Sequence, residues 1–415
     1  MSNSRVLVAQ LGARRHYQQP ILFHQWGVLD SFYTDFYVGK TWLTALLKHT
    51  AIYNQLPNTL KKGLDRYTPE LDTAQIIHFP TFGYQYAQAW RKASSEEKSR
   101  LSIKVGKEFC QKIIQKGLGN ANVVYGFNGA SLELFEYAKA RGIRCILDQT
   151  VAERSLIYKL LLQEEKDWPN WSLSPFTVNK SDIELVQREQ HEQDLADHII
   201  CGSSFVKDSL IARGVNADKV SVVPLGRCKD KQMQSYDVTY KSQNQQNGEL
   251  KILFAGTVEL RKGIPYLLKA LRELQGKISF TCKVAGSLQI KPQRIAEYSD
   301  ICSFLGVVPR SQMSELYAWA DVFVLPSICE GSAMVTYEAM NWKLPIVTTP
   351  NAGSIVRNNI DGFVVPVKNP SSIANKLLEV YTHKINEEQK NSTDLYQKQI
   401  FHSSELKLRQ ALVEN

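Results

Sequence analysis

The chain is poor in the cysteine patterns on which disulfides and zinc sites depend. Its seven cysteines are scattered over 415 residues, with no Cys-x-x-Cys pair and no repeated spacing of a zinc site. An odd number of separated cysteines is typical of reduced, packed thiols in a cytosolic protein. We therefore expect no structural metal.

Long hydrophobic runs are also lacking. The N-terminal residues lead almost at once into the strand-like run RVLVAQL, so we expect no secretory leader there. No stretch reaches the roughly 20 apolar residues that are needed to span a bilayer. These absences predict a cytoplasmic location, with peripheral contact at the inner face of the membrane as an additional hypothesis.

Three phosphate-binding signatures are missing. The first expected strand ends in Gly12-Ala13-Arg14-Arg15 instead of a Gly-x-Gly-x-x-Gly turn, which argues against a nicotinamide or flavin dinucleotide. There is no P-loop, and there is no Asp-x-Asp pair that could hold a metal–diphosphate complex. We therefore predict no cofactor and no metal site.

Charge is what the sequence does have, with 50 basic and 41 acidic residues and a formal net charge of +9. Such a balance suits an anionic partner, for example a nucleotide, anionic lipid or nucleic acid, although solubility alone is an equal explanation. The basic and aromatic residues follow no nucleic-acid-binding motif. We expect no nucleic acid partner.

Short β-branched runs alternate with amphipathic helical stretches, which is typical of parallel sheets wrapped by helices. A polar run between residues 227 and 248 interrupts this alternation. We therefore predict an α/β protein with two Rossmann-like domains, at 1–225 and 251–370, joined by a polar linker or exposed loop at 226–250. A helical segment at 371–415, capped by Ser371, is expected to pack back toward the N-terminal domain.

The expected strands fall into two series. They are RVLVAQL, QIIHFP, NVVYGF, IRCILD, DHIICG and KVSVVP in the first half, and KILFAG, TCKVAGS, ICSFLG, DVFVLPS, PIVTTP and GFVVPV in the second. Because parallel α/β sheets bind ligands at the carboxyl ends of their strands, the loops that follow these runs should carry the chemistry.

The most informative segment is DVFVLPSICEGSAMVTYEAMNWKLPIVTT. It predicts a strand, a loop of small residues and a helix whose free N-terminal amides and positive dipole end suit a diphosphate. The alternative is that Glu330 caps this helix and Glu338 is a surface charge. The residues expected to bind this ligand are Glu330, Gly331, Ser332, Ala333, Met334, Val335 and Glu338.

The run EGSAMVTYEAM resembles the E-x7-E motif of the retaining GT-B glycosyltransferases of family 4. Further motifs agree in the same order, from FAGTVELRKGIPYLLKA through KVAGS, FLGVVPRSQMSELYAWADVFVLPS and PIVTTPNAGS to DGFVVPV. The resemblance implies a GT-B fold, in which two Rossmann-like domains face a cleft. It also implies metal-independent transfer of a sugar, with retention, from a nucleotide diphosphate donor to the hydroxyl of a saccharide, a lipid-linked saccharide or a small molecule.

Residue roles follow from the same resemblance. Glu330 would contact the hydroxyls of the transferred sugar, and Glu338 those of the ribose. Lys262 matches the lysine that neutralises the diphosphate, and a cation is favourable there because negative charge grows on the leaving group. Val308 lies where the family packs the base, although a valine after a strand is more often core.

The chain departs from the family pattern at Thr257, where many members carry a second phosphate-binding arginine. Arg261 is the candidate substitute, and the alternative is a site that holds the diphosphate less firmly. Catalytic candidates are thus Glu330, Lys262 and Arg261.

The N-terminal half matches the family more loosely. Gly12, Arg14 and Arg15 either border the cleft, with an arginine facing the donor phosphates, or lie on the surface. Gln149 stands where the family often has a sugar-contacting histidine.

Two amphipathic stretches are candidates for contact with acceptor or membrane: residues 41–67, and residues 153–176 with Trp168 and Trp171. The alternative is that their apolar faces pack on the protein itself.

Two other functions remain open at this point. One is a catalytically silent GT-B subunit that binds a nucleotide sugar or a partner, and the other is an enzyme of different chemistry, such as an epimerase.

Overall fold

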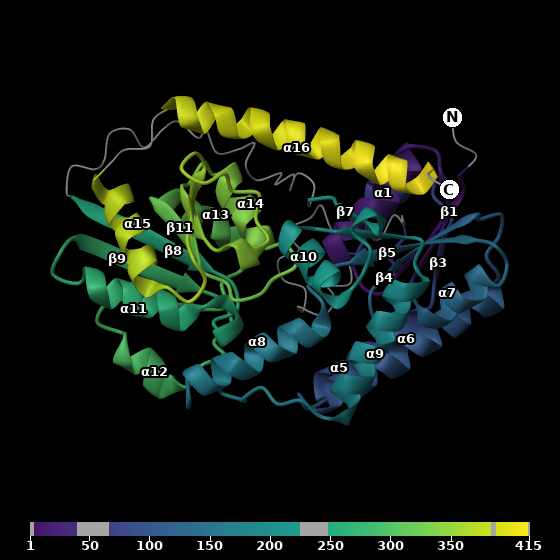
Figure 1. Ribbon diagram of the computed structural model, residues 1–415, viewed down its shortest axis with the longest axis horizontal. Coiled ribbons are helices and arrows are strands. Elements are labelled where there is room, and N and C mark those ends of the chain that lie inside the picture. Colours follow the sequence, from purple (N-terminus) through teal and green to yellow (C-terminus); the bar gives the residue numbers. More distant parts are fainter. Residues whose placement is uncertain (1–3, 40–65, 225–247, 383–386, 414–415) are drawn as a thin grey trace.

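A computed structural model describes residues 4–39, 66–224, 248–382 and 387–413, except for the side chains of Arg15, residues 387–392 and Asp394. These residues form two parallel sheets, each flanked by helices (Figure 1). The linker expected at 226–250 lies almost wholly in 225–247, outside the described residues. Most of the stretch 41–67 is outside them too.

The N-terminal sheet has seven parallel strands in the order β3-β2-β1-β4-β5-β6-β7. Their bounds are β1 Val6–Gln10, β2 Leu29–Thr34, β3 Ile76–His78, β4 Val123–Phe127, β5 Arg144–Gln149, β6 His198–Cys201 and β7 Val220–Val222. All six strands expected in this half are present. The sequence did not predict β2, because its run LDSFYT mixes polar residues with apolar ones although Ser31 and Thr34 are buried.

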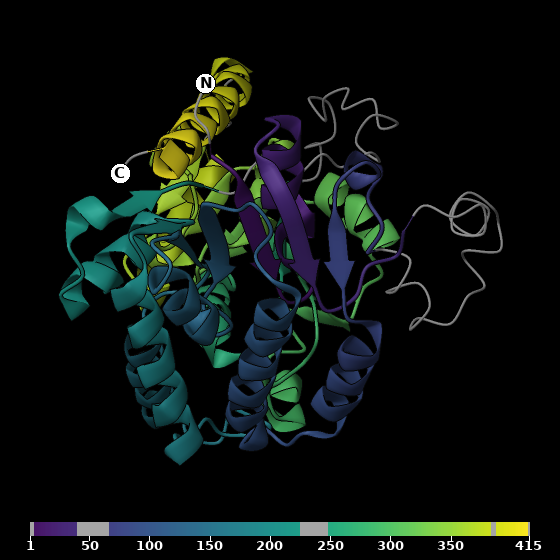
Figure 2. The same ribbon diagram turned by 90° about the vertical axis from the view of Figure 1, so that its right-hand side faces the viewer.

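Helices cover both faces of this sheet (Figure 2). Their bounds are α1 Gln18–Gln25, α5 Pro80–Lys92, α6 Glu97–Lys116, α7 Leu132–Lys139, α8 Arg154–Asp167, α9 Lys180–Leu195 and α10 Ser204–Arg213. Local capping explains several starts. Asn179 and Asp182 form a capping box at α9, and the Ser203 hydroxyl accepts from the Val206 amide at α10.

The C-terminal sheet has six parallel strands in the order β10-β9-β8-β11-β12-β13, and all six were expected. Their bounds are β8 Glu249–Ala255, β9 Ser279–Ala285, β10 Ser303–Gly306, β11 Val322–Leu325, β12 Ile346–Thr348 and β13 Gly362–Val364. The helices are α11 Ile264–Leu274, α12 Pro292–Glu297, α13 Arg310–Trp319, α14 Met334–Asn341, α15 Pro370–Thr382 and α16 Glu387–Val413.

The expected capping role of Ser371 is wrong. The helix α15 already begins at Pro370, and the side chain of Asn369 accepts a hydrogen bond from the Ser372 amide at 2.9 Å. The Ser371 hydroxyl instead donates to Glu273. Asparagine caps a helix as well as serine does, and the capping residue lies two positions before the predicted one.

The helix α16 crosses from the C-terminal sheet to the N-terminal sheet (Figure 1). Near its start the Thr393 hydroxyl donates to Asp361 at 2.6 Å. Near its end Leu408 and Leu412 join the core beneath β1, and the carbonyl of Leu412 accepts from Ser4. The C-terminal segment therefore joins the two domains.

The helix α8 and the residues after it make a second connection. Glu164 is fully buried, and its carboxylate accepts from Tyr266 and pairs with Lys368 at 2.5 Å, both from the C-terminal domain. Trp168 packs edge to face on Tyr266, and Trp171 belongs to the C-terminal core. The two tryptophans therefore serve packing between domains, so the hypothesis that they face a membrane or acceptor is wrong.

Within the described part of the chain, every helix is too short or too polar to cross a membrane.

The buried carboxylate yields a test. Lys368→Met keeps the apolar stem but leaves the Glu164 carboxylate with only the Tyr266 hydroxyl as a partner. We expect the free energy of unfolding, measured by urea denaturation at pH 8, to fall by about 1–3 kcal/mol. This is less than for a fully buried ion pair, because Lys368 is partly exposed. Burial raises the pKa of Glu164, against the lowering effect of Lys368. Without the lysine, protonation removes the buried charge, so the deficit relative to wild type should shrink as the pH falls toward 5.

Lys104→Met is the matched control, because Lys104 and Glu108 form an exposed pair 3.9 Å apart. It should cost less than about 1 kcal/mol at either pH. Equal losses in the two variants would show that the α8 connection does not depend on this ion pair.

Candidate functional site

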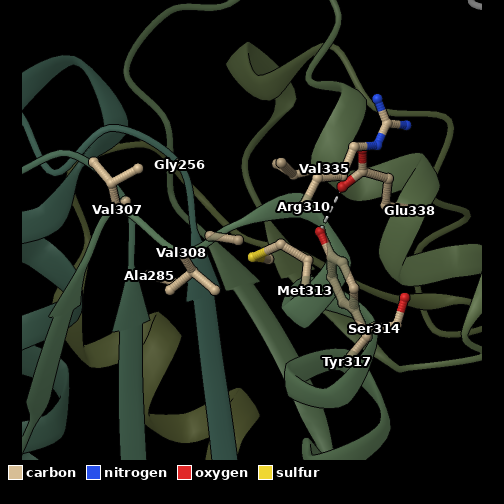
Figure 3. A pocket seen from close by; sticks show the side chains of 12 residues that line it. Gly256, Ala285, Val307, Val308, Arg310, Met313, Ser314, Tyr317, Val335 and Glu338 are labelled. Carbon is tan, nitrogen blue, oxygen red and sulfur yellow. Dashed lines mark hydrogen bonds between the residues drawn. The ribbon is translucent and has the colours of Figure 1, made fainter. Parts of the chain in front are cut away.

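A cavity of about 270 Å³ lies at the carboxyl ends of β8, β9 and β10 (Figure 3). Its apolar lining comes from Ala255, Ala285, Val308, Met313 and Val335, and its polar side chains are Arg310, Ser314, Tyr317 and Glu338. An apolar cavity with a few convergent polar groups is the usual form of a small-molecule site. Val308 and Val335, both expected in the ligand site, line this cavity.

Glu338 lies at one edge of this cavity, one turn into α14. It is partly buried, and its Oε2 accepts a hydrogen bond from the Tyr317 hydroxyl at 2.8 Å (Figure 3). Tyr317 itself is buried and stacks on Trp342. The tyrosine therefore fixes the direction of the carboxylate.

The sequence interpretation missed the contribution of α13. Arg310, Met313, Ser314 and Tyr317 all line the cavity, and their positions repeat at intervals of three, one and three residues. That spacing places them on one face of a helix. The signal was present in the sequence, but an apolar and polar mixture on such a face does not distinguish a ligand site from a packing face.

A cluster of charges occupies the loops after β8 and β11. Glu330 Oε1 lies 2.7 Å from Lys262 Nζ and also accepts from Arg261, whose guanidinium pairs with Glu259 at 2.6 Å. Burial alone would lower the pKa of Arg261, but Glu330 and Glu259 outweigh it and raise that pKa. The structure thus brings the three catalytic candidates together around one carboxylate oxygen.

Thr257 lies beside this cluster. It follows Gly256, and a Cβ on that glycine would stand 3.7 Å from Lys262 Cε. The residue before Thr257 is therefore close to the Lys262 side chain, and Thr257 itself supplies no cation there.

The small-residue loop leads into α14. Among the described residues, the amides of Met334 and Val335 have no hydrogen-bond acceptor, so they present the free end of the helix. The hydroxyl of Ser332 bonds to Tyr337, and the amide of Ala333 donates to Ala352. Ser332 and Ala333 therefore shape the loop.

Gly331 packs directly against the N-terminal domain. A Cβ on this residue would stand 1.8 Å from the carbonyl oxygen of Thr150, in the loop after β5. Its own carbonyl accepts from the Ser203 hydroxyl at 2.6 Å. A second approach links the loops after β1 and β10, where His16 lies 3.5 Å from Arg310. The carboxyl ends of the two sheets therefore face each other.

The candidate residues of the N-terminal half lie in different environments. Gly12 has a left-handed backbone and donates its amide to Asp35, while the half-buried Arg14 lies against Asn128 at the end of β4. Only the backbone of Arg15 is described, so its expected role is outside the described part. Gln149 is fully buried and bonds to Val151 and Gln193. The structure does not bring the Gln149 side chain to the space between the domains.

Residues 249–383 match the family model described as Glycosyl transferases group 1. The chain is similar to a glycosyltransferase of Methanocaldococcus jannaschii, with 33% identity over 31% of this chain and 35% of that protein. It is also similar to a D-inositol 3-phosphate glycosyltransferase of Paenarthrobacter aurescens, with 28% identity over 47% and 52%. The matches span about a third to a half of the length of these relatives.

Solved structures resemble the whole chain. A glycosyltransferase from Rickettsia africae has a TM-score of 0.55 at 15% identity, with 99% of this chain and 98% of that one covered. HepE of Anabaena, solved with UDP, has a TM-score of 0.55 at 14% identity, with 98% and 99% covered. With the two facing parallel sheets, these neighbours show the GT-B fold.

The approach of Gly331 to Thr150 can be tested directly. Gly331→Ala adds a Cβ that cannot fit against the Thr150 backbone, so we expect a loss of about 1–3 kcal/mol in urea denaturation. Gly39→Ala is the control, because a Cβ there meets open space and the backbone is not left-handed. If Gly331→Ala is no less stable than Gly39→Ala, the two loops are not in contact in solution.

Proposed function

We propose that the chain is a metal-independent, retaining glycosyltransferase that takes a sugar from a nucleoside diphosphate donor. One observation carries this proposal: Glu338 and Val335, the latter at the free end of α14, line the apolar cavity together with Gly256, and Gly256 lies beside Lys262, which pairs with Glu330. Taken in this sequence, from the cavity to Glu330, these groups define a path. The path has the order of chemical groups of such a donor, namely base, ribose, diphosphate and sugar.

The cavity and Glu338 would hold the nucleoside. A flat base fits between Val308 and the apolar residues opposite, and the carboxylate of Glu338 accepts hydrogen bonds from the ribose hydroxyls. The Tyr317 hydroxyl donates to Oε2 of Glu338 and holds this carboxylate at the edge of the cavity. HepE, which shares this fold, bound UDP and UDP-glucose in its crystals.

The diphosphate would lie between Lys262 and the amides of Met334 and Val335. These groups stabilise the charge that grows on the leaving phosphate, which is where stabilisation lowers the barrier most. As the diphosphate arrives, Lys262 exchanges part of its pairing with Glu330 for phosphate oxygens. Glu330 is then available to accept hydrogen bonds from the sugar hydroxyls.

The reaction exchanges one bond for another at the anomeric carbon. The bond from this carbon to the phosphate oxygen breaks, and a bond to the acceptor oxygen forms on the same face, so the configuration is retained. The acceptor proton moves to the departing phosphate. The protein holds the reactants in place and stabilises charge, without a covalent intermediate. The acceptor is a saccharide or a lipid-linked saccharide.

Nucleotide binding tests the position of Glu338. We expect wild type to bind at least one of UDP, GDP and ADP in calorimetry, and Glu338→Ala to bind it about ten-fold or more weakly, because charge-assisted hydrogen bonds contribute roughly 1.5–3 kcal/mol. Glu315→Ala, an exposed residue of the neighbouring helix α13, should bind like wild type. Unchanged binding in a folded Glu338→Ala protein would remove Glu338 from the site.

Turnover tests Lys262. With a panel of nucleotide sugars, hydrolysis or transfer should persist in chelator, and Lys262→Ala should lose about 10²–10³ in kcat with little change in KM. Lys277→Ala, exposed at the end of α11, is the control. Because Arg261 and Lys262 share Glu330, the double substitution should cost less than the sum of the single ones. Loss of turnover in chelator, restored by magnesium or manganese, would contradict the proposal, and so would tight nucleotide binding without any turnover.

A further inference from the structure

Arg14 lies at the carboxyl end of the N-terminal sheet, where the order of the strands changes direction. It follows β1, and β1 lies between β2 and β4, so the strand order changes direction at the boundary of β1 and β4. In open α/β sheets the loops on the two sides of this boundary separate and leave a crevice in which ligands bind. The guanidinium of Arg14 spans the boundary, because it contacts Asn128 after β4.

The contacts of Arg14 use little of its hydrogen-bonding capacity. Its Nη1 lies 3.5 Å from the carbonyl oxygen of Asn128, and its guanidinium lies 5.7 Å from the ring of Phe127. Among the described residues, no carboxylate lies within ion-pair distance of it. A guanidinium has five N–H donors, and most of those of Arg14 have no acceptor in the described part of the chain.

The nearby arginines differ in this respect. Arg66 pairs with Asp35 at 2.8 Å, Arg154 with Glu189 at 2.6 Å, and Arg188 with Glu133 at 2.6 Å. Each of these cations is neutralised by a protein carboxylate. Burial lowers the pKa of Arg14, and the more distant Glu189 and Asp148 oppose that effect. A partly desolvated cation without a close counter-ion is unfavourable unless a ligand supplies one.

A short path of contacts connects Arg14 to the donor side. Asn128 contacts Arg14 through its carbonyl, and its side-chain oxygen accepts from the Thr150 amide at 3.1 Å and hydroxyl at 2.7 Å. The Thr150 carbonyl in turn lies against Gly331, next to Glu330. These contacts therefore connect Arg14 to the loop that carries Glu330, at the sugar end of the proposed donor.

Among the described residues, open space borders the loop at Gly12. A Cβ on Gly12, two residues before Arg14, would meet no atom within 4 Å, while the Gly12 amide is held by Asp35. The loop is thus fixed in place and bordered by open space. A ligand could approach the guanidinium from this side.

We propose that Arg14 binds an anionic group of the acceptor, a phosphate or a carboxylate, and so selects acceptors that carry an oxyanion. This inference rests on the proposed function, which places the donor sugar beside Glu330. The oxyanion accepts two parallel N–H donors from the guanidinium, in the bidentate geometry that arginine favours. The acceptor hydroxyl then points from Arg14 toward the anomeric carbon.

The test uses the full-length chain with UDP, GDP or ADP, whichever binds most tightly, held at saturation so that the donor phosphate site is occupied. Inorganic phosphate, acetate and uncharged glucose are titrated by calorimetry at constant ionic strength. We expect phosphate or acetate to bind wild type and glucose to bind at least ten-fold more weakly. Binding of inorganic phosphate would identify the oxyanion as a phosphate, and binding of acetate would identify it as a carboxylate.

Variants separate Arg14 from other sites. Arg14→Gln should weaken anion binding at least ten-fold, Arg14→Lys should lose part of it because a lysine cannot bind in a bidentate manner, and both should bind nucleotide like wild type. Arg141→Gln is the matched control, since Arg141 is exposed and stacks on Tyr137.

Results that contradict the role of Arg14 can be told apart from results that contradict the proposed function. Equal anion binding by wild type and Arg14→Gln would overturn the inference, as would the absence of anion binding to the nucleotide-loaded wild type. Weaker nucleotide binding by Arg14→Gln would place Arg14 on the donor phosphates instead. Failure of wild type to bind any nucleotide would refute the proposed function itself.

Discussion

The close contact between the backbones of Gly331 and Thr150 is the constraint on which the candidate site depends. It brings the loop after β11 against the loop after β5 with no room for a side chain. The carboxyl ends of two independent sheets are thereby directed at one another. Glu330 precedes this glycine and α14 follows shortly after it, so the same contact positions the charged loop and the free helix end relative to the N-terminal domain.

The charged side chains of the site neutralise one another. Glu330 lies between Lys262 and Arg261, and Glu259 holds the far side of Arg261. Two cations and two carboxylates balance when no ligand is bound, which limits the cost of keeping partly buried charges in a preformed arrangement. An incoming diphosphate has only to replace one set of anionic oxygens with another.

Much of this was predictable from the sequence. Continuous apolar runs identified twelve of the thirteen strands that the described residues form, and the order of motifs indicated the fold and the candidate residues Glu330, Lys262 and Glu338. Contacts between distant segments were not predictable, because periodicity shows that a face is buried but not what covers it. For that reason the sequence left open whether Trp168 and Trp171 face a membrane or pack on the protein, and it could not show that the Gln149 side chain is buried.

The helices α8 and α16 both cross between the domains, on opposite sides of the molecule in Figure 1. Two crossings of this kind act as a pair of pivots, since each is anchored by buried groups in both domains. Pulling the two domains apart would break both anchors. A small rotation of one domain about the axis through α8 and α16 would break neither. Opening for ligand exchange should therefore be a rocking movement about that axis, and its amplitude is set by how far two helices can bend.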